Sequence, residues 1–259
     1  MTMILELDQG NTRCKWRLLN AAAAGSGRVV ARGALERDFW GGGSELPAEW
    51  LDAGVARVRV ANVAGAGREK QIAERLQVAL GLQAEFARVA PRCGAVTCAY
   101  PEPRWLGVDR WLAVLAAHAR DPAPALVVDC GSAVTLDLLG AGGAHLGGYI
   151  VPGLALMRRA LYQDTDAVKV ARAFAPGMSL APGRDTQAAV NRGLPLMVLG
   201  AVERALAELQ QCAERDLMPN IWLTGGDAAL FSTLEPLAGT LRHTLVEDLV
   251  MEGLALTNP

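Results

Sequence analysis

Apolar and polar residues alternate at the start of the chain in the way that half-buried strands require. In 4–8 (ILELD) and again in 14–18 (CKWRL) successive side chains point to opposite faces. The residues between these runs, Gln9-Gly10-Asn11-Thr12, predict a hairpin turn, because glycine and asparagine both accept a positive φ. The pattern therefore predicts two antiparallel strands joined by a polar turn.

The same design recurs near the middle of the chain. A buried strand, Ala125–Val128, ends at Asp129, and the turn Cys130-Gly131-Ser132 leads into an outward strand, Thr135–Leu139. Both copies share Asp-x-Gly-[Asn/Ser], and a third apolar run, 221–231 (IWLTGGDAALF), also breaks off at a glycine turn. The repeat predicts two related half-domains that face one nucleotide.

The residues of the first turn suit a phosphate group. A glycine lets backbone N–H groups approach an anion, and the Thr12 hydroxyl and the Lys15 ammonium add further donors. Asp8, at the end of the strand, offers the oxygen ligand that a hard cation such as Mg²⁺ prefers. Either copy taken alone is explained more simply as an ordinary Asp-Gly hairpin, so the phosphate hypothesis depends on the repetition and on the third glycine turn.

Strands and helices alternate along the rest of the first half, which favours an α/β architecture. Residues 57–63 predict a strand, and 69–80 predict a helix with Ile72, Leu76 and Leu80 four residues apart. Two prolines in 121–124 (DPAP) interrupt the pattern, because proline does not fit inside a regular element. We therefore expect a domain boundary here, with half-domains at 1–121 and 122–259.

Composition narrows the class of protein. With 259 residues, 51% of them hydrophobic, the chain can bury one large core or two ordinary ones. A net charge of −2 gives no electrostatic footprint for nucleic acid or for an anionic membrane. The chain begins directly with a strand pattern and has no apolar run of membrane-spanning length, so we expect a cytoplasmic protein.

Cysteine and histidine chemistry contributes little to the prediction. Five cysteines without a C-x-x-C pair and three scattered histidines argue against a structural zinc site and against a disulfide framework. Cys130 lies beside the second turn, but the sequence shows no histidine pattern that would activate it as a nucleophile. The glycine motifs of P-loop and Rossmann proteins are also absent.

The segment Tyr100–Trp111 (YPEPRWLGVDRW) holds the most informative carboxylate. Asp109 precedes an apolar helical run, 111–118, and is placed to cap it. A carboxylate at a helix start, beside Gly107 and Arg110, is also suited to accept a proton from a substrate hydroxyl during phosphoryl transfer. Thr186 stands at the start of a long predicted helix, where capping is again the simplest role.

Taken together and in order, these motifs resemble the type III pantothenate kinases, a family within the acetate kinase/sugar kinase/Hsp70/actin superfamily. The resemblance spans essentially the whole chain. It is carried by five segments, namely Asp8–Lys15, Leu106–Arg110, Asp129–Thr135, Gly147–Gly153 and Leu223–Ala228. It implies an α/β fold of two actin-like (ribonuclease H-like) half-domains, each a mixed sheet flanked by helices, with a nucleotide cleft between them.

The resemblance also implies a reaction and a set of residues. The reaction is phosphorylation of pantothenate by ATP with Mg²⁺, the first step of coenzyme A biosynthesis. The residues implied for ATP are Asp8, Gln9, Gly10, Asn11, Thr12, Arg13, Cys14, Lys15 and Ser132. Those implied for pantothenate are Tyr100, Gly107, Val108, Asp109, Arg110 and Thr186, with Asp109 as the general base. Asp129 is implied to hold a monovalent cation, K⁺ or NH₄⁺, and the family implies a homodimer.

One departure and two alternatives accompany this hypothesis. Ser132 stands where the family usually has threonine, which keeps the hydroxyl but loses the methyl group that restrains the rotamer. The phosphate hairpins alone would suit another small-molecule kinase of the superfamily, and only Tyr100–Arg110 and Thr186 argue for pantothenate. The other alternative is a non-catalytic nucleotide-binding accessory or regulatory protein.

Overall fold

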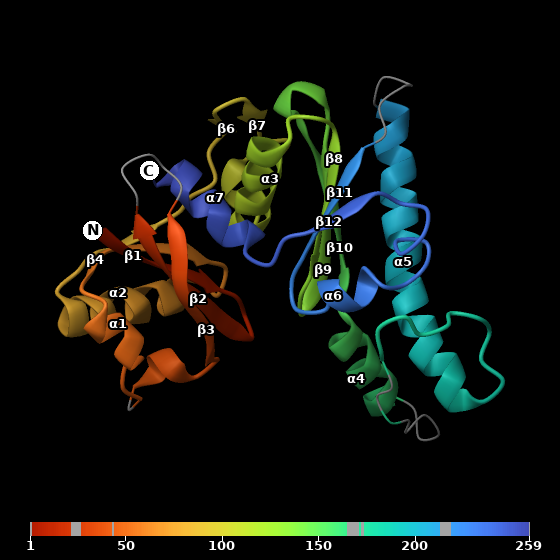
Figure 1. Cartoon of the computed structure of the whole chain (residues 1–259), viewed down its shortest axis with the longest axis horizontal. Helices are drawn as coiled ribbons and strands as arrows, with labels where there is room; N and C mark the ends of the chain where they lie inside the picture. Colours follow the sequence, from red (N-terminus) through yellow and green to blue (C-terminus); the bar gives the residue numbers. More distant parts are fainter. Residues whose placement is uncertain are drawn as a thin grey trace. The chain divides into compact units, whose positions relative to one another are not determined.

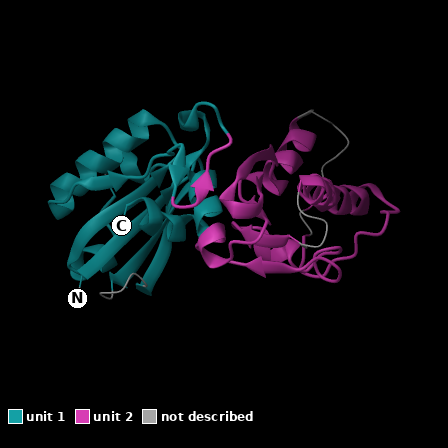
Figure 2. Cartoon of the chain, turned by 90° about the horizontal axis from the view of Figure 1, so that it is seen from above, with its two compact units in different colours: residues 1–93, 100–116, 249–259 teal, residues 94–99, 117–248 magenta. Residues whose placement is uncertain are grey.

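The structure is a computed structural model of the whole chain, and it describes residues 2–21, 27–42, 44–164, 171, 174–212 and 219–258. The chain divides into two compact units (Figure 2). Unit 1 holds 1–93, 100–116 and 249–259, and unit 2 holds 94–99 and 117–248. Each unit contains one five-stranded sheet with helices (Figure 1).

Unit 1 is built on a sheet with the strand order β3-β2-β1-β4-β5. Strands β1, β2 and β3 are antiparallel neighbours, whereas β4 and β5 run parallel to β1. The strands are β1 (Thr2–Gln9), β2 (Arg13–Ala21), β3 (Arg28–Glu36), β4 (Val55–Asn62) and β5 (Ala84–Phe86). The helices are α1 (Ala48–Asp52), α2 (Ala66–Leu80), α3 (Val108–Arg120), which continues into unit 2, and α7 (Leu249–Thr257).

The core of unit 1 follows from the alternation along its strands. Leu5 and Leu7 of β1 are fully buried in an apolar cluster with Trp16, Trp40 and Trp50. Helix α2 adds Ile72 and Leu76, four residues apart, and packs against β4 and β5. Helix α7 packs against β1 and β4.

Unit 2 repeats this sheet. Its strand order is β10-β9-β8-β11-β12, with β8, β9 and β10 antiparallel and β11 and β12 parallel to β8. The strands are β8 (Ala125–Cys130), β9 (Ala133–Leu139), β10 (His145–Pro152), β11 (Asn220–Thr224) and β12 (His243–Leu245). The helices are α4 (Leu154–Asp164), α5 (Thr186–Cys212) and α6 (Ala228–Phe231), and α5 packs along β8, β9 and β10. Short strands β6 (Arg92–Cys93) and β7 (Val96–Thr97) precede α3.

The two sheets are equivalent position by position around their first strands. Asp8 is the next-to-last residue of β1, and Asp129 is the next-to-last residue of β8. In each case a hairpin follows. The neighbouring parallel strand places Ala61 opposite Asp8 in unit 1 and Thr224 opposite Asp129 in unit 2. The prediction of two related α/β half-domains, each with a mixed sheet flanked by helices, is confirmed.

The predicted elements agree with the structure, although their ends shift by a few residues. Both hairpins, the strand in 57–63 and the helix in 69–80 are present. The compact units are not continuous in sequence, because contacts assign α7 to unit 1 and the division falls inside α3. A half-domain boundary at residues 121 and 122 stays a prediction. No helix in the described ranges combines the length and the apolar character needed to cross a membrane.

Candidate functional site

The first hairpin places a carboxylate and an ammonium group on one face of the unit 1 sheet. Asp8 lies directly opposite Lys15 in the ladder between β1 and β2, so the two side chains leave the same face. The backbone N–H of Gly10 donates to the carbonyl of Arg13 at 3.0 Å and closes the turn. Asn11 and Thr12 at its tip are exposed. The turn thus presents the donors that a phosphate group requires.

The opposite face of this hairpin is buried. Gln9 is 2% exposed and Cys14 is fully buried, and the two lie opposite each other in the ladder. Burial raises the pKa of the Cys14 thiol, and the nearby Asp8 carboxylate raises it further. Cys14 therefore stays a neutral thiol, and its side chain supports the hairpin from the core side rather than meeting a ligand as a thiolate.

Asp109 lies in the first turn of α3. The helix begins at Val108, and the N–H of Trp111 donates to the carbonyl of Gly107, so Gly107 rather than Asp109 occupies the capping position. Asp109 is therefore not at the N-cap position itself, although its carboxylate accepts one first-turn N–H as the capping expectation required. Its Oδ1 accepts the N–H of Arg110 at 2.8 Å.

Gly107 is required by the position of this carboxylate. A Cβ atom on residue 107 would lie 2.5 Å from Oδ1 of Asp109, closer than any real Cβ contact. The Asp109 side chain is therefore folded back over Gly107, in a half-buried place beside the helix start.

Arg110 and Tyr100 meet in the same segment. Arg110 is 6% exposed, and its Nη1 donates to the Tyr100 hydroxyl at 3.0 Å, with the guanidinium 5.9 Å from the centre of the Tyr100 ring. A buried, permanently charged guanidinium held by a phenol is suited to a carboxylate ligand. The structure thus brings Tyr100 next to Arg110, with Gly107, Val108 and Asp109 adjoining in the chain.

Three turns converge around the second hairpin, in unit 2. The N–H of Gly131 donates to the carbonyl of Ala133, and the N–H of Gly153, just before α4, donates to the carbonyl of Ser132 at 3.1 Å. The N–H of Asp227, in the turn after β11, donates to the carbonyl of Cys130 at 2.9 Å. The third glycine turn singled out in the sequence therefore packs against the second one.

Asp129 is half-buried, and the turn after β11 lies against it. Gly225 has φ +94°, and a Cβ there would lie 2.3 Å from Oδ1 of Asp129. Burial raises the pKa of the Cys130 thiol, with further contributions from the Asp129 and Asp227 carboxylates. A raised pKa is the opposite of what a nucleophilic cysteine needs, so the structure disfavours a reactive Cys130.

Neither carboxylate belongs to a protein cage for a metal ion. Within the part of the chain that the structure describes, no three His, Cys, Asp or Glu side chains are grouped to hold a metal.

Thr186 is the first residue of α5 and is exposed. The cap of this helix is Asp185, whose Oδ1 accepts the N–H of Ala188 at 2.8 Å. The expectation that Thr186 itself is the cap is wrong, so capping does not explain the presence of its hydroxyl. Thr186 belongs to unit 2, whereas Tyr100 and Gly107–Arg110 belong to unit 1.

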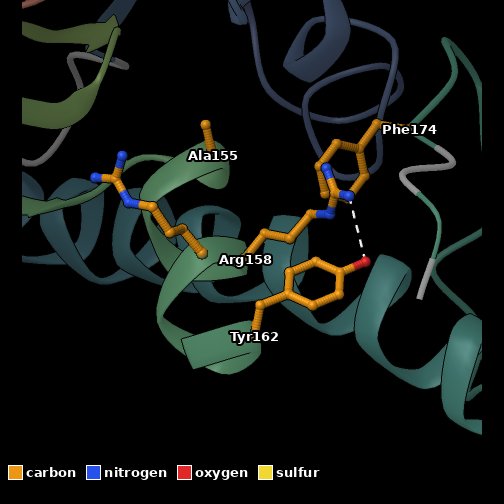
Figure 3. A pocket seen from close by; sticks show the side chains of 5 residues that line it. Ala155, Arg158, Tyr162 and Phe174 are labelled. Carbon is orange, nitrogen blue, oxygen red and sulfur yellow. Dashed lines mark hydrogen bonds between the residues drawn. The ribbon is translucent and has the colours of Figure 1, made fainter. Parts of the chain in front are cut away.

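Two cavities in unit 2 include residues that sequence reasoning missed. One, of about 210 Å³, is lined by Ala155, Arg158, Arg159, Tyr162 and Phe174 (Figure 3). Arg158 Nη2 donates to the Tyr162 hydroxyl at 3.2 Å. The sequence could have indicated this cavity through two adjacent arginines, Arg158 and Arg159, which follow the Pro152-Gly153 turn by about one helical turn. The other, of about 440 Å³, lies beside Thr186 and is lined by Met178, Ser179, Asp185, Gln187, Ala188, Asn191 and Arg192.

Solved structures identify the fold class. A putative Baf family transcriptional activator from Campylobacter jejuni superposes with a TM-score of 0.59 at 19% identity and covers 96% of this chain and 94% of its own. A putative 2-dehydro-3-deoxygalactonokinase from Sinorhizobium meliloti superposes with a TM-score of 0.57 at 15% identity and covers 98% and 97%. The chain thus shares the fold of these two structures, an actin-like α/β fold.

Sequence comparison then identifies the family. Residues 4–208 match the family described as type III pantothenate kinase. A type III pantothenate kinase from Chromohalobacter salexigens is 39% identical over 258 residues, which cover 99% of this chain and 88% of the relative. The chain belongs to the type III pantothenate kinase family.

Proposed function

We propose that this chain is a cytoplasmic enzyme that phosphorylates pantothenate with ATP to give 4'-phosphopantothenate, with Asp109 as the general base. The observation that carries the proposal is the Asp109 carboxylate, folded over Gly107 in the first turn of α3, with the buried Arg110–Tyr100 pair beside it. Family membership supplies the reaction, and this segment supplies the chemistry that the reaction needs.

The step is a direct in-line transfer. The primary hydroxyl oxygen of pantothenate attacks the γ-phosphorus of ATP, and the bond from that phosphorus to the oxygen bridging the β-phosphate breaks. Asp109 takes the hydroxyl proton, and ADP leaves. Arg110, with Tyr100 and Thr186, binds pantothenate, and its guanidinium is suited to the substrate carboxylate.

ATP is assigned to the two hairpins. Backbone N–H groups of the first turn, Thr12 and Lys15 donate to phosphate oxygens, and Ser132 does so from the second turn. Mg²⁺ bound with ATP would neutralise phosphate charge, with Asp8 as its carboxylate ligand, and K⁺ or NH₄⁺ would be held at Asp129. The half-buried carboxylates at both strand ends fit these cations.

We also propose a homodimer that associates through unit 2. Several large apolar side chains on β10, α4 and α5 are exposed, namely Leu146, Tyr149, Ile150, Leu156, Leu196 and Met197. Strand β10 is at the edge of its sheet, where an uncovered apolar strand is a hazard for a monomer. Sedimentation of the chain as a monomer at micromolar concentration would contradict this part of the proposal.

The decisive assay follows transfer of the γ-phosphoryl group of ATP to pantothenate, with K⁺ present and absent, and with sugars and small carboxylates as competing acceptors. We expect transfer to pantothenate, stimulated by K⁺. Preferred transfer to another acceptor would identify a different kinase of the superfamily. ATP binding without transfer to any acceptor would identify an accessory protein.

A further inference from the structure

Gln9, the residue between Asp8 and Gly10 in the first Asp-x-Gly turn, is buried on the core side of the sheet. Its side chain is 2% exposed. By strand alternation it shares a face with Leu5 and Leu7, whereas Asp8 points to the opposite face with Lys15. A polar amide in an apolar core needs hydrogen-bond partners, because an unsatisfied buried amide is costly.

Trp40 supplies one partner and the hairpin itself supplies the other. The indole Nε1 of Trp40 donates to Oε1 of Gln9 at 2.7 Å. An indole N–H can only donate, so this bond fixes which end of the amide is the oxygen. Nε2 of Gln9 then donates to the carbonyl oxygen of Gly10 at 2.6 Å. The two bonds form a chain from the core to the backbone of the turn.

Trp40 is itself held firmly. It is 3% exposed, and its ring centre lies 6.3 Å from that of Trp50 and 5.2 Å from that of Phe39. The guanidinium of Arg75, from α2, lies 4.4 Å from the Phe39 ring centre and 6.0 Å from that of Trp40. Packing between α2 and the sheet therefore holds the indole in place and fixes the direction of its N–H.

These two hydrogen bonds set the direction of one backbone donor, the N–H of Asn11. In a planar trans peptide the N–H points opposite to the C=O. With the Gly10 carbonyl drawn to the core side by Gln9, the N–H of Asn11 points to the other side, where Asp8 and Lys15 leave the sheet. The N–H of Gly10 is already used by Arg13, so the N–H of Asn11 is the next donor of the turn.

We propose that Gln9, anchored by Trp40, is a positioning residue that aims the Asn11 N–H at the phosphates of ATP. The proposal rests on the proposed function, because it needs the first hairpin to bind ATP. The two Asp-x-Gly turns of this chain differ at this position, with Gln9 in the first turn and Cys130 in the second, so the anchor belongs to the first turn alone.

The test compares two identical substitutions in one aromatic cluster. Trp40→Phe keeps an aromatic ring but removes the donor to Gln9. Trp50→Phe makes the same change to a fully buried indole whose Nε1 has no hydrogen-bond partner. Calorimetric titration with ATP should show about a 10-fold weaker Kd for Trp40→Phe, the loss expected from one well-aligned buried hydrogen bond. We expect Trp50→Phe to keep the wild-type Kd for ATP, and both variants to keep the Kd for pantothenate.

A second substitution tests the hydrogen bond from Gln9 to Gly10 separately from the hydrogen bond from Trp40 to Gln9. Gln9→Glu can still accept from Trp40 but, as a carboxylate, cannot donate to the Gly10 carbonyl, so ATP binding should weaken while the Trp40 contact survives. Thermal unfolding of each variant shows whether it is folded. If Gln9→Glu does not fold, the comparison of Trp40→Phe with Trp50→Phe still tests the positioning role.

The outcomes are distinct. Equal Kd values for ATP in Trp40→Phe and Trp50→Phe would overturn the positioning role. Wild-type protein that binds ATP but transfers nothing to pantothenate would contradict the proposed function while the tryptophan comparison still decides the role of Gln9. Wild-type protein that does not bind ATP would overturn both.

Discussion

A Cβ atom on Gly107 would lie 2.5 Å from Oδ1 of Asp109. The nearest obstacle to an alanine at this position is thus the end of a movable side chain, and not the backbone. Gly107→Ala should leave the fold intact and displace the carboxylate, lowering kcat up to about 100-fold, because a misplacement of about 1 Å can cost that much. The measurement is steady-state phosphoryl transfer combined with thermal unfolding.

The matched control for this variant is Gly67→Ala, in the first turn of α2. Nothing lies within 4 Å of a Cβ on Gly67, so alanine there should leave kcat unchanged and raise stability slightly through helix propensity. An unchanged kcat in Gly107→Ala would mean that the position of the Asp109 carboxylate does not matter for turnover.

Gly225 and Gly226 should respond oppositely to alanine. At Gly225 the backbone has φ +94°, and a Cβ would lie 2.3 Å from Oδ1 of Asp129 and within 2.7 Å of the Cys130 backbone. We expect a loss of more than about 2 kcal/mol in the free energy of unfolding, from backbone strain and overpacking together. At Gly226 nothing lies within 4 Å, so Gly226→Ala should be neutral. Denaturant unfolding of the pair is decisive, and equal midpoints would contradict the convergence of turns in unit 2.

A row of alternating charges crosses the unit 1 sheet two residues along the strands from Asp8 and Lys15, on the same face. Arg17, Glu6, Arg59 and Glu85 lie opposite one another on four neighbouring strands. Glu6 is fully buried and bonds Arg17 at 2.7 Å and Arg59 at 3.2 Å. Glu6→Gln should cost about 3–5 kcal/mol of unfolding free energy, because two buried guanidinium groups lose their counter-charge.

The control is Glu85→Gln in the same row. Its ion pair with Arg57 is about one-third exposed, so the loss should stay below about 1 kcal/mol. Chemical denaturation of both variants tests the contrast, and a small effect at Glu6 would show that the buried network adds little to stability.

Cysteine reactivity tests the electrostatics of the two hairpins. Burial raises the pKa of Cys14 and of Cys130, so both should remain protonated thiols at neutral pH. Alkylation of native protein at pH 7 should modify the exposed Cys212 quickly and spare Cys14 and Cys130, which should react only after unfolding. Rapid native modification of Cys130, read by peptide mass spectrometry, would restore it as a candidate nucleophile.

Sequence alone predicts those parts of this fold that depend on local pattern. Both hairpins are visible because strand alternation and a glycine turn occur within 13 to 15 consecutive residues, 4–16 and 125–139. Their repetition is enough to predict two equivalent sheets. The helix caps were harder, because neighbouring residues compete: Asp185 is the cap rather than Thr186, and Gly107 rather than Asp109.

Features that depend on distant parts of the chain could not be predicted. The fit of Gly225 against Asp129 requires β11 to pair beside β8, nearly 100 residues earlier in the chain. The Trp40–Gln9 bond joins a core aromatic residue to the middle residue of the first Asp-x-Gly turn, and no sequence motif indicates it. The Glu6 network likewise appears only when the strands are placed side by side.

The central claim, that Asp109 removes the hydroxyl proton of pantothenate, is tested most directly by Asp109→Asn, with the exposed Asp52→Asn as control. We expect Asp109→Asn to bind ATP and pantothenate with wild-type Kd values but to lose about 10²–10⁴-fold in kcat, and Asp52→Asn to behave as wild type. Near-normal turnover of Asp109→Asn would contradict the claim.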